Sequence, residues 1–196
     1  MQCRVCLYST DEISPALKRL IPEQRLRFLS VLPPRRRKQS VLAEALLRLM
    51  LSDEFGVSPE TIVMDRTPGQ KPRTELSDFS LSHTLGASAA AVGPGAGIDM
   101  ELIRKPRLKA AAACFTPQEL DYMSSGSDER FWEIWTRKEA LFKSLSSGAW
   151  ETVCEQNTLE NPFLHTLVRD GFVLSVFSQD EPDIAFTTEE ELTAFL

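Results

Sequence analysis

The 196-residue sequence contains no apolar run that approaches the roughly 20 residues needed to cross a bilayer. Its first residues, Met1-Gln2-Cys3-Arg4-Val5, also lack the long apolar stretch of a secretory signal. An apolar fraction of 42% and a charged fraction of 26% are ordinary for a globular protein in water. We therefore expect a cytoplasmic protein without membrane association.

Cysteine and histidine are scarce as well, with four residues of the first kind and two of the second. Cys3 and Cys6 have the spacing of half a zinc site, but the sequence offers no matching second half. Cys114 and Cys154 complete neither a paired metal motif nor a disulfide framework. We therefore expect reduced cysteines in core positions, with no zinc site and no disulfide bond.

Positive charge is in deficit, and the net charge of -6 argues against general nucleic-acid binding. Two basic clusters nevertheless stand out, RRRK at residues 35–38 and RKPRLK at residues 104–109. Concentrated basic patches on an acidic protein suit a small polyanionic ligand or an acidic partner. Solvated helix ends explain either cluster equally well when it is considered alone.

Apolar periodicity and turn residues predict an alternating series of strands and helices. Helices are expected at residues 14–20, 22–29, 34–55, 108–113, 117–123 and 129–145. Strands are expected at residues 3–8, 61–65, 79–84, 87–92, 96–102, 163–168 and 172–177, with a third C-terminal strand at 184–187. The longest helix starts after two prolines and ends at Gly56, which are favourable residues for those positions.

The order of strand, helices and strands occurs twice and divides near residue 101. This repetition predicts an α+β protein of two similar halves, residues 1–101 and residues 102–196. If the two halves pair within one chain, a monomer is the simplest assembly.

Two carboxylates point to one side of the strand expected at residues 96–102. Asp99 and Glu101 are two residues apart, and alternate side chains of a strand share a face. Such like charges repel each other unless a cation lies between them or water screens them. Magnesium takes carboxylate oxygens of this kind, whereas an exposed acidic strand end is the competing explanation. Gly97 just before them would let a ligand approach the backbone closely.

A second group of functional side chains lies on the helix expected at residues 129–145. Trp135, Glu139 and Lys143 are spaced by four residues and therefore share one helical stripe. Glu139 and Lys143 would form an ordinary stabilising ion pair on any exposed helix. Together with the acidic strand, however, they outline a site for phosphate chemistry, with three carboxylates for a hard cation and a nearby lysine.

Five sequence blocks follow one another in a specific order: GQKP at 69–72, FSLSHT at 79–84, GIDME at 97–101, FTPQE at 115–119 and WTRKEALFK at 135–143. In these blocks the chain resembles the 4′-phosphopantetheinyl transferases, in particular the larger pseudo-dimeric type that serves peptide, polyketide and fatty-acid synthases. The first block is a weak signal. The GIDxE and WxxKEAxxK blocks in this order are a specific one.

The resemblance implies a fold of two halves related by a pseudo-twofold axis, each a small, mainly antiparallel sheet packed against a long helix. It implies that coenzyme A is the donor and that a serine of an acyl or peptidyl carrier protein is the acceptor. The serine oxygen would attack the β-phosphorus of coenzyme A, with Mg²⁺ as cofactor and 3′,5′-ADP as the product released.

The resemblance also implies a role for each matching residue. Asp99, Glu101 and Glu139 would bind the magnesium ion, and Lys143 would contact the pyrophosphate and steady the leaving charge. Glu139 is in addition our candidate for accepting the serine proton, so whether it acts as base, ligand or both stays open. The residues expected at the 3′-phosphate and nucleotide end of coenzyme A are Lys71, Pro72, Ser82 and His83.

The N-terminal third departs from the family pattern. The family commonly has an arginine for the 3′-phosphate near the start of the long helix, where this chain has Gln39 by register. Arg36, Arg37 or Lys38 would replace it from the preceding turn, and the sequence leaves open which one does.

A carrier-binding surface is expected near the metal site, because carrier proteins are usually acidic. Its basic candidates are Arg104, Lys105, Arg107 and Lys109. In this family the stretch after the WxxKEAxxK helix also contributes to carrier contact. Its apolar candidates, for which a role in the core is an equal alternative, are Leu145, Trp150 and Val153.

Two other interpretations compete with an active transferase. A catalytically degraded relative would bind coenzyme A or a carrier without turnover, and the departure at Gln39 is compatible with it. A magnesium-dependent phosphohydrolase would share the acidic site, but it would not explain the ordered set of motifs.

Overall fold

The structure, a computed structural model, describes residues 1–67, 70–106, 108–145, 149–194 and 196. Its strands are β1 (Gln2–Leu7), β2 (Phe79–Thr84), β3 (Ala87–Val92), β4 (Gly97–Leu102), β5 (Leu164–Arg169), β6 (Phe172–Phe177) and β7 (Asp183–Thr188). Its helices are α1 (Pro15–Arg19), α2 (Glu23–Leu29), α3 (Pro34–Phe55), α4 (Leu108–Cys114), α5 (Pro117–Ser124), α6 (Asp128–Ser144), α7 (Trp150–Cys154) and α8 (Glu189–Ala194), with a 3₁₀ turn η1 (Pro59–Thr61).

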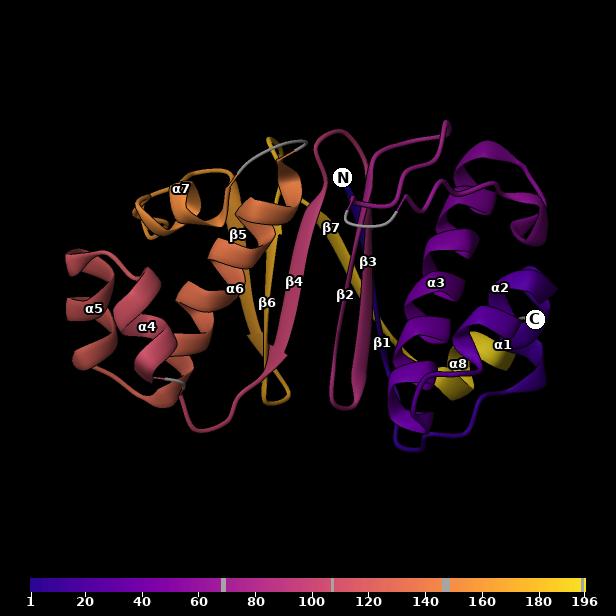
Figure 1. Ribbon diagram of the computed structural model, residues 1–196, viewed down its shortest axis with the longest axis horizontal. Helices are drawn as coiled ribbons and strands as arrows, with labels where there is room; N and C mark the ends of the chain where they lie inside the picture. The colour runs from indigo at the N-terminus through magenta and orange to yellow at the C-terminus, as the bar shows by residue number, and fades with distance from the viewer. Residues whose placement is uncertain (68–69, 107, 146–148, 195) are drawn as a thin grey trace.

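Two small sheets packed against helices make up the fold, as the α+β prediction required. The first sheet has the order β2-β3-β1-β7, and the second has the order β4-β6-β5. All pairs are antiparallel except β1 with β7. Helix α3 covers the first sheet and helix α6 covers the second, so that the strands stand between two long helices (Figure 1).

Hydroxyl groups join the two sheets where β2 meets β4. Ser80, Ser82 and Thr84 alternate along β2 and therefore share one face of that strand. Their side-chain oxygens accept hydrogen bonds of 3.1, 3.1 and 3.3 Å from backbone N–H groups of β4, those of Ile98, Met100 and Leu102. This seam fixes the register of β4 against β2 and brings the acidic strand beside the FSLSHT block.

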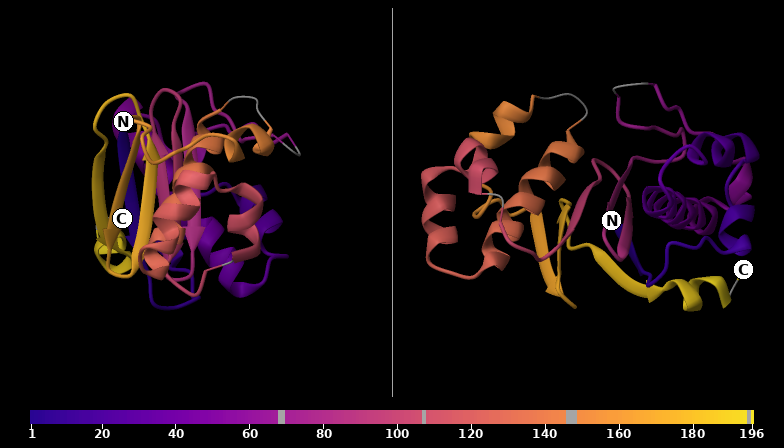
Figure 2. Two further views of the ribbon diagram at one scale, coloured as in Figure 1. Left: turned by 90° about the vertical axis from the view of Figure 1, so that its left-hand side faces the viewer. Right: turned by 60° about the horizontal axis from the view of Figure 1, so that its bottom comes forward.

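The C-terminal segment returns to the first sheet. The strand predicted at residues 184–187 forms as β7, but it pairs in parallel with β1 and does not extend the β5–β6 hairpin. Figure 2 shows β7 and α8 crossing from the second half to the first. Strand β4, which contains the predicted boundary at residue 101, in turn pairs with β6. The halves therefore exchange strands, and their separate functional roles stay a prediction.

The strand predicted at residues 61–65 is wrong. Only Thr61 of this segment lies in the 3₁₀ turn η1, and only Asp65 is paired, in an isolated antiparallel bridge with Arg73. Residues 62–64 have no strand partner in the described part of the chain, so no ladder forms.

The expectation of four reduced cysteines is also wrong, because Cys114 and Cys154 form a disulfide. These residues are separated by 40 positions and end helices α4 and α7, which meet in the folded chain. No local spacing signals such a pair. Cys3 and Cys6 are free and buried in the first sheet, as predicted. No helix in the described part of the chain is long and apolar enough to cross a bilayer.

Helix α6 lies directly on strand β4 at Gly97. A Cβ atom added at this glycine would lie 2.1 Å from the carbonyl oxygen of Ala140 and 2.8 Å from the backbone nitrogen of Ser144. The close backbone approach expected at Gly97 is therefore made by α6. It sets the distance between the acidic strand and the helix that carries Glu139 and Lys143.

Gly97→Ala is expected to lower the free energy of unfolding by about 2–3 kcal/mol, because the added methyl group overlaps a helix backbone that cannot move alone. Urea denaturation measures the change. Gly126→Ala is the comparison variant, since its methyl group would meet the Arg130 side chain, which can rotate away at the cost of its contacts with Tyr122 and Ser125. We expect this variant to lose about 1 kcal/mol or less, a smaller loss than that of Gly97→Ala. Equal stability of both variants would contradict the assigned role of Gly97.

Candidate active site

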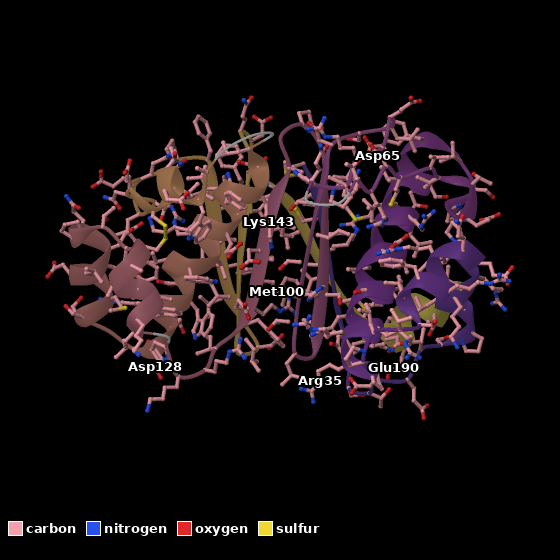
Figure 3. The ribbon with its side chains drawn as sticks, viewed as in Figure 1. Arg35, Asp65, Met100, Asp128, Lys143 and Glu190 are labelled. Atoms are coloured by element: carbon pink, nitrogen blue, oxygen red, sulfur yellow. A yellow bond between two sulfur atoms is a disulfide. The ribbon has the colours of Figure 1, made fainter. Side chains whose placement is uncertain are left out.

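A cavity of about 350 Å³ lies where α3, β2, β4 and α6 face one another. Six of the residues predicted from the sequence line it: Ser82, His83, Asp99, Glu101, Glu139 and Lys143. Figure 3 labels Lys143 and, near it, Met100, which stands between Asp99 and Glu101 on β4. The acidic strand and the stripe of α6 thus meet in one place, as their spacing suggested.

Asp99 lies at the centre of this arrangement and is 6% exposed. Its Oδ1 atom accepts a hydrogen bond of 2.8 Å from the Ser82 hydroxyl and is 2.7 Å from the Lys143 ammonium nitrogen. Its Oδ2 atom is buried and has no hydrogen-bond partner among the described residues. A buried carboxylate oxygen without a partner is costly, so this atom is suited to a cation or to a donor from a ligand.

Glu101 and Glu139 contribute the other two carboxylates. The hydroxyl of Thr84 donates a hydrogen bond of 2.9 Å to Glu101, and Arg104 lies 3.4 Å from the same carboxylate oxygen. The pKa of Glu139 is raised by desolvation and by the negative charges of Asp99 and Glu101, while Lys143 opposes the shift. The three carboxylates therefore influence one another across the cavity.

Whether these residues could bind a metal ion depends on their carboxylate oxygens. Among the described residues, no three carboxylate, histidine or cysteine side chains already stand as a closed metal-binding cluster. The cavity that Asp99 lines, however, also has Glu101 and Glu139 in its wall, and carboxylate oxygens are the donors that Mg²⁺ prefers. Since Mg²⁺ usually keeps waters and phosphate oxygens as ligands, an open set of carboxylates fits it.

Glu139→Gln is expected to raise the melting temperature of the metal-free protein near neutral pH. A raised carboxyl pKa means that folding favours the protonated form, so the associated stability is complete below the usual value of 4.5. That stability is lost as the pH rises through the raised value of the folded protein. The advantage of glutamine should therefore vanish at low pH. The difference in melting temperature between the variant and the unmodified protein is measured from melting curves recorded with a metal chelator present. Glu160→Gln, at an exposed position, is the control.

Ser82 and His83 lie side by side in β2 but serve different contacts. Ser82 is buried. Its hydroxyl donates a hydrogen bond to Asp99 and accepts one from the backbone N–H of Met100 in β4. Desolvation lowers the pKa of His83, and the positive charges of Lys143 and Arg36 add to this effect. The imidazole is therefore neutral near pH 7, with one ring nitrogen as a hydrogen-bond donor and the other as an acceptor.

Lys71 and Pro72 do not line this cavity; they line a separate one of about 280 Å³. The ammonium group of Lys71 donates hydrogen bonds of 2.8 Å to the carbonyl of Ala96 and 2.7 Å to the carbonyl of Lys143. Desolvation lowers the pKa of this lysine. Lys71 thus ties the end of α6 to the start of β4, close behind the cavity. Gly69 of the same block lies outside the described residues.

The basic residues at the start of α3 make contacts with different parts of the protein. Arg37 donates to the carbonyls of Ser30 and Leu32 at 2.7 and 3.0 Å, next to the end of α2. Lys38 is buried, and its ammonium group donates to the backbone carbonyl of Glu12 and to the carboxylate of Glu189. Gln39 donates its amide to the Thr84 carbonyl at 2.7 Å. Arg36 is exposed, and its positive charge contributes to lowering the pKa of His83.

A group of arginines at the cavity was missed by sequence reasoning. Glu44 on α3 is buried, and one of its carboxylate oxygens lies 2.8 Å from nitrogens of both Arg25 and Arg66. Arg48 approaches the other oxygen at 3.1 Å. Glu44 and Arg48 are spaced by four residues, which was a readable signal, but nothing local pointed to Arg25 or Arg66. Three guanidinium groups against one carboxylate leave positive charge in excess at this end of the cavity.

The chain was compared with known proteins. Residues 95–194, about half of the chain, match the family described as the 4′-phosphopantetheinyl transferase superfamily. The chain is 37% identical over 126 residues to the 4′-phosphopantetheinyl transferase AcpT of Salmonella typhimurium, covering 57% of this chain and 62% of that protein. It is 34% identical over 121 residues to AcpT of Escherichia coli K12, covering 57% and 61%. It is 27% identical over 118 residues to the 4′-phosphopantetheinyl transferase gsp of Aneurinibacillus migulanus, covering 57% and 50%. The matches thus span half to two thirds of these relatives.

Proposed function

The chain belongs to the 4′-phosphopantetheinyl transferase superfamily, and from this premise we propose that it transfers the 4′-phosphopantetheine group of coenzyme A to a serine of an acyl or peptidyl carrier protein. The observation that carries the proposal is the convergence of Asp99, Glu101, Glu139 and Lys143 on one cavity, with Lys143 in contact with Asp99. A cytoplasmic monomer that binds neither nucleic acid nor membrane remains part of this proposal.

In the proposed reaction, the serine oxygen forms a bond to the β-phosphorus of coenzyme A while the bond to the leaving 3′,5′-ADP breaks. Mg²⁺, held by Asp99, Glu101 and Glu139, would neutralise charge on the pyrophosphate. Glu139 is also our candidate for accepting the serine proton, either directly or through a water molecule bound to the metal. Lys143 stabilises the negative charge that develops on the leaving group.

The opposite end of the cavity would hold the nucleotide end of the donor. The positive excess around Glu44, together with Arg36 and the neutral His83, supports binding of a phosphate there. Arg37 and Lys38 are engaged elsewhere, so we no longer expect them to replace the family arginine at Gln39. We propose accordingly that residues 1–101 serve the nucleotide side and residues 102–196 the metal and carrier side.

The carrier would approach near the start of α4. Arg104, Lys105 and Lys109 are exposed there, and Leu108 between them is 63% exposed. Basic groups around an exposed apolar side chain suit an acidic partner with an apolar contact. Arg107 lies outside the described residues. Val153, one of the apolar candidates, is fully buried and belongs to the core.

The test is to mix the chain with coenzyme A, Mg²⁺ and unmodified carrier proteins of fatty-acid and peptide synthases, and then to weigh each carrier. We expect a carrier whose mass has increased by one phosphopantetheine group on its acceptor serine. Binding of coenzyme A with no mass change in any carrier would overturn the proposal in favour of a degraded binding relative. Release of phosphate products without a carrier would point to a phosphohydrolase.

A further inference from the structure

The disulfide between Cys114 and Cys154 lies at a second cavity, of about 490 Å³. Both cysteines line it, together with two tryptophans and two glutamates: Trp135, Trp150, Glu151 and Glu155. Cys114 is 5% exposed, whereas Cys154 is partly exposed. Cys154 is therefore the cysteine of the pair that a small molecule in this cavity would meet first.

Helix α7, which Cys154 ends, is clamped onto α6. The ring of Trp150 lies 5.8 Å from that of Trp135 and 5.4 Å from that of Phe142. The buried ammonium of Lys138 donates hydrogen bonds of 3.1, 3.3 and 2.8 Å to the carbonyls of Val153, Cys154 and Gln156. Lys138 directly precedes Glu139, and Trp135 lines both this cavity and the candidate active site. Helix α7 is therefore held on α6 by Lys138, Trp135 and Phe142, and these contacts do not include Glu139 or Lys143.

A helix of five residues such as α7 has little stability of its own, so its position depends on these attachments. The disulfide is the attachment that ties it to α4. Disulfides in proteins of reducing compartments are mostly transient and serve catalysis or redox sensing. A disulfide that borders a cavity is more typical of these transient disulfides than of a fully buried structural disulfide.

We propose that Cys114 and Cys154 form a thiol–disulfide exchange site for small, uncharged or cationic thiols, and that its reduction frees α7 from α4 and weakens carrier binding. The second part rests on the proposed function, because it takes α7 as part of the carrier side. Donor binding would be unaffected, since the carboxylates, Lys143 and the arginines around Glu44 are held by other contacts.

The exchange balances with two thiols. The first thiolate attacks Sγ of Cys154, forming a mixed disulfide, and the bond between the two protein sulfurs breaks to release Cys114 as a thiolate that takes up a proton. A second thiol attacks the mixed disulfide and leaves the Cys154 thiol. Two small thiols are thereby oxidised to one small disulfide, and the protein disulfide is reduced to two thiols.

The charge of the cavity determines which thiols react fastest. Glu151 and Glu155 are both exposed at its wall and repel anionic thiolates that carry a further negative group. At equal thiolate concentration, cysteamine and 2-mercaptoethanol should therefore reduce the bond about threefold or more faster than mercaptoethanesulfonate. The double variant Glu151→Gln/Glu155→Gln should reduce this difference in reduction rate between the thiols.

The first measurement is the mass of the folded chain after alkylation, before and after treatment with each thiol. We expect no alkylation of the oxidised protein and two alkyl groups, on Cys114 and Cys154, after reduction. Cys3 and Cys6 serve as internal controls, since burial raises the pKa of each to about 12 and keeps them unreactive in the folded chain. Two alkyl groups on the folded chain after incubation with oxidised 2-mercaptoethanol, or reduction that requires denaturant, would overturn the exchange site.

The second measurement compares oxidised and reduced protein for the KM of the carrier and the Kd of coenzyme A. Reduction should raise the carrier KM about threefold to tenfold and leave the coenzyme A Kd unchanged. Cys154→Ser should match the reduced protein and should not respond to thiols. An unchanged carrier KM would refute the coupling. If no carrier is modified in either state, the proposed transferase function has failed, while alkylation and direct titration of carrier binding still decide the exchange site and its effect.

Discussion

Asp99→Asn is expected to lower kcat/KM for phosphopantetheine transfer by at least about 10³-fold. Asparagine keeps the size of the side chain and an oxygen that can accept the Ser82 hydrogen bond. It removes the negative charge that faces Lys143 at 2.7 Å and the buried Oδ2 atom that suits a cation. The loss should appear as weaker Mg²⁺ activation together with a slower chemical step.

The rate of mass gain by the carrier, measured over a range of Mg²⁺ concentrations, tests this expectation. Asp170→Asn is the matched control, because Asp170 is exposed in a turn at φ 51°, a conformation that asparagine tolerates well. The control should transfer at the unmodified rate. Near-normal turnover by Asp99→Asn, in a protein that melts cooperatively, would mean that the three carboxylates do not form the metal site.

Lys143→Gln is expected to lower kcat by about 10²–10³-fold, the effect of removing one preorganised group that stabilises the leaving charge. Its ammonium is fixed between the end of α6 and the carboxylate of Asp99, and it lies partly open to the cavity. A group that acts on developing charge affects kcat more than the KM of coenzyme A. Single-turnover kinetics separate these two quantities.

Two variants accompany this measurement. Lys143→Arg should recover part of the lost rate because it keeps the positive charge, although its planar group has a different reach. Lys18→Gln, at an exposed position on α1, should change nothing. Gln39→Ala should lower the rate of phosphopantetheine transfer less than Lys143→Gln does, because the Gln39 side-chain amide donates its hydrogen bond to the Thr84 carbonyl. A larger loss from Gln39→Ala would assign the phosphate contact to that position.

Local structure was predictable wherever the signal was local. The bounds of α3, β2, β3 and β6 agree with the prediction, because prolines, glycines and apolar periodicity act within a few residues along the chain. The segment at residues 61–65 failed for the complementary reason. A strand needs a partner, and among the described residues only Asp65 of this segment is paired, in an isolated bridge with Arg73.

The candidate site divides in a similar way. Asp99 and Glu101 had to share a strand face, and Glu139 and Lys143 a helical stripe, because those relations follow from backbone geometry. Their meeting in one cavity depended on the contact of α6 with β4 at Gly97, where the sequence suggested a ligand. Lys71 bonds the carbonyls of Ala96 and Lys143, and its predicted contact with coenzyme A stays a prediction.

The sequence by itself determined the α+β class, most element bounds and the set of carboxylates and lysine at the centre of the site. Tertiary structure alone decided the pairing of β7 with β1, the Cys114–Cys154 disulfide and the gathering of Arg25 and Arg66 at Glu44. The physical reason is range. Backbone geometry relates residues a few positions apart, whereas a sheet edge, a sulfur or a buried carboxylate takes as partner whichever group the packing of distant elements brings within reach.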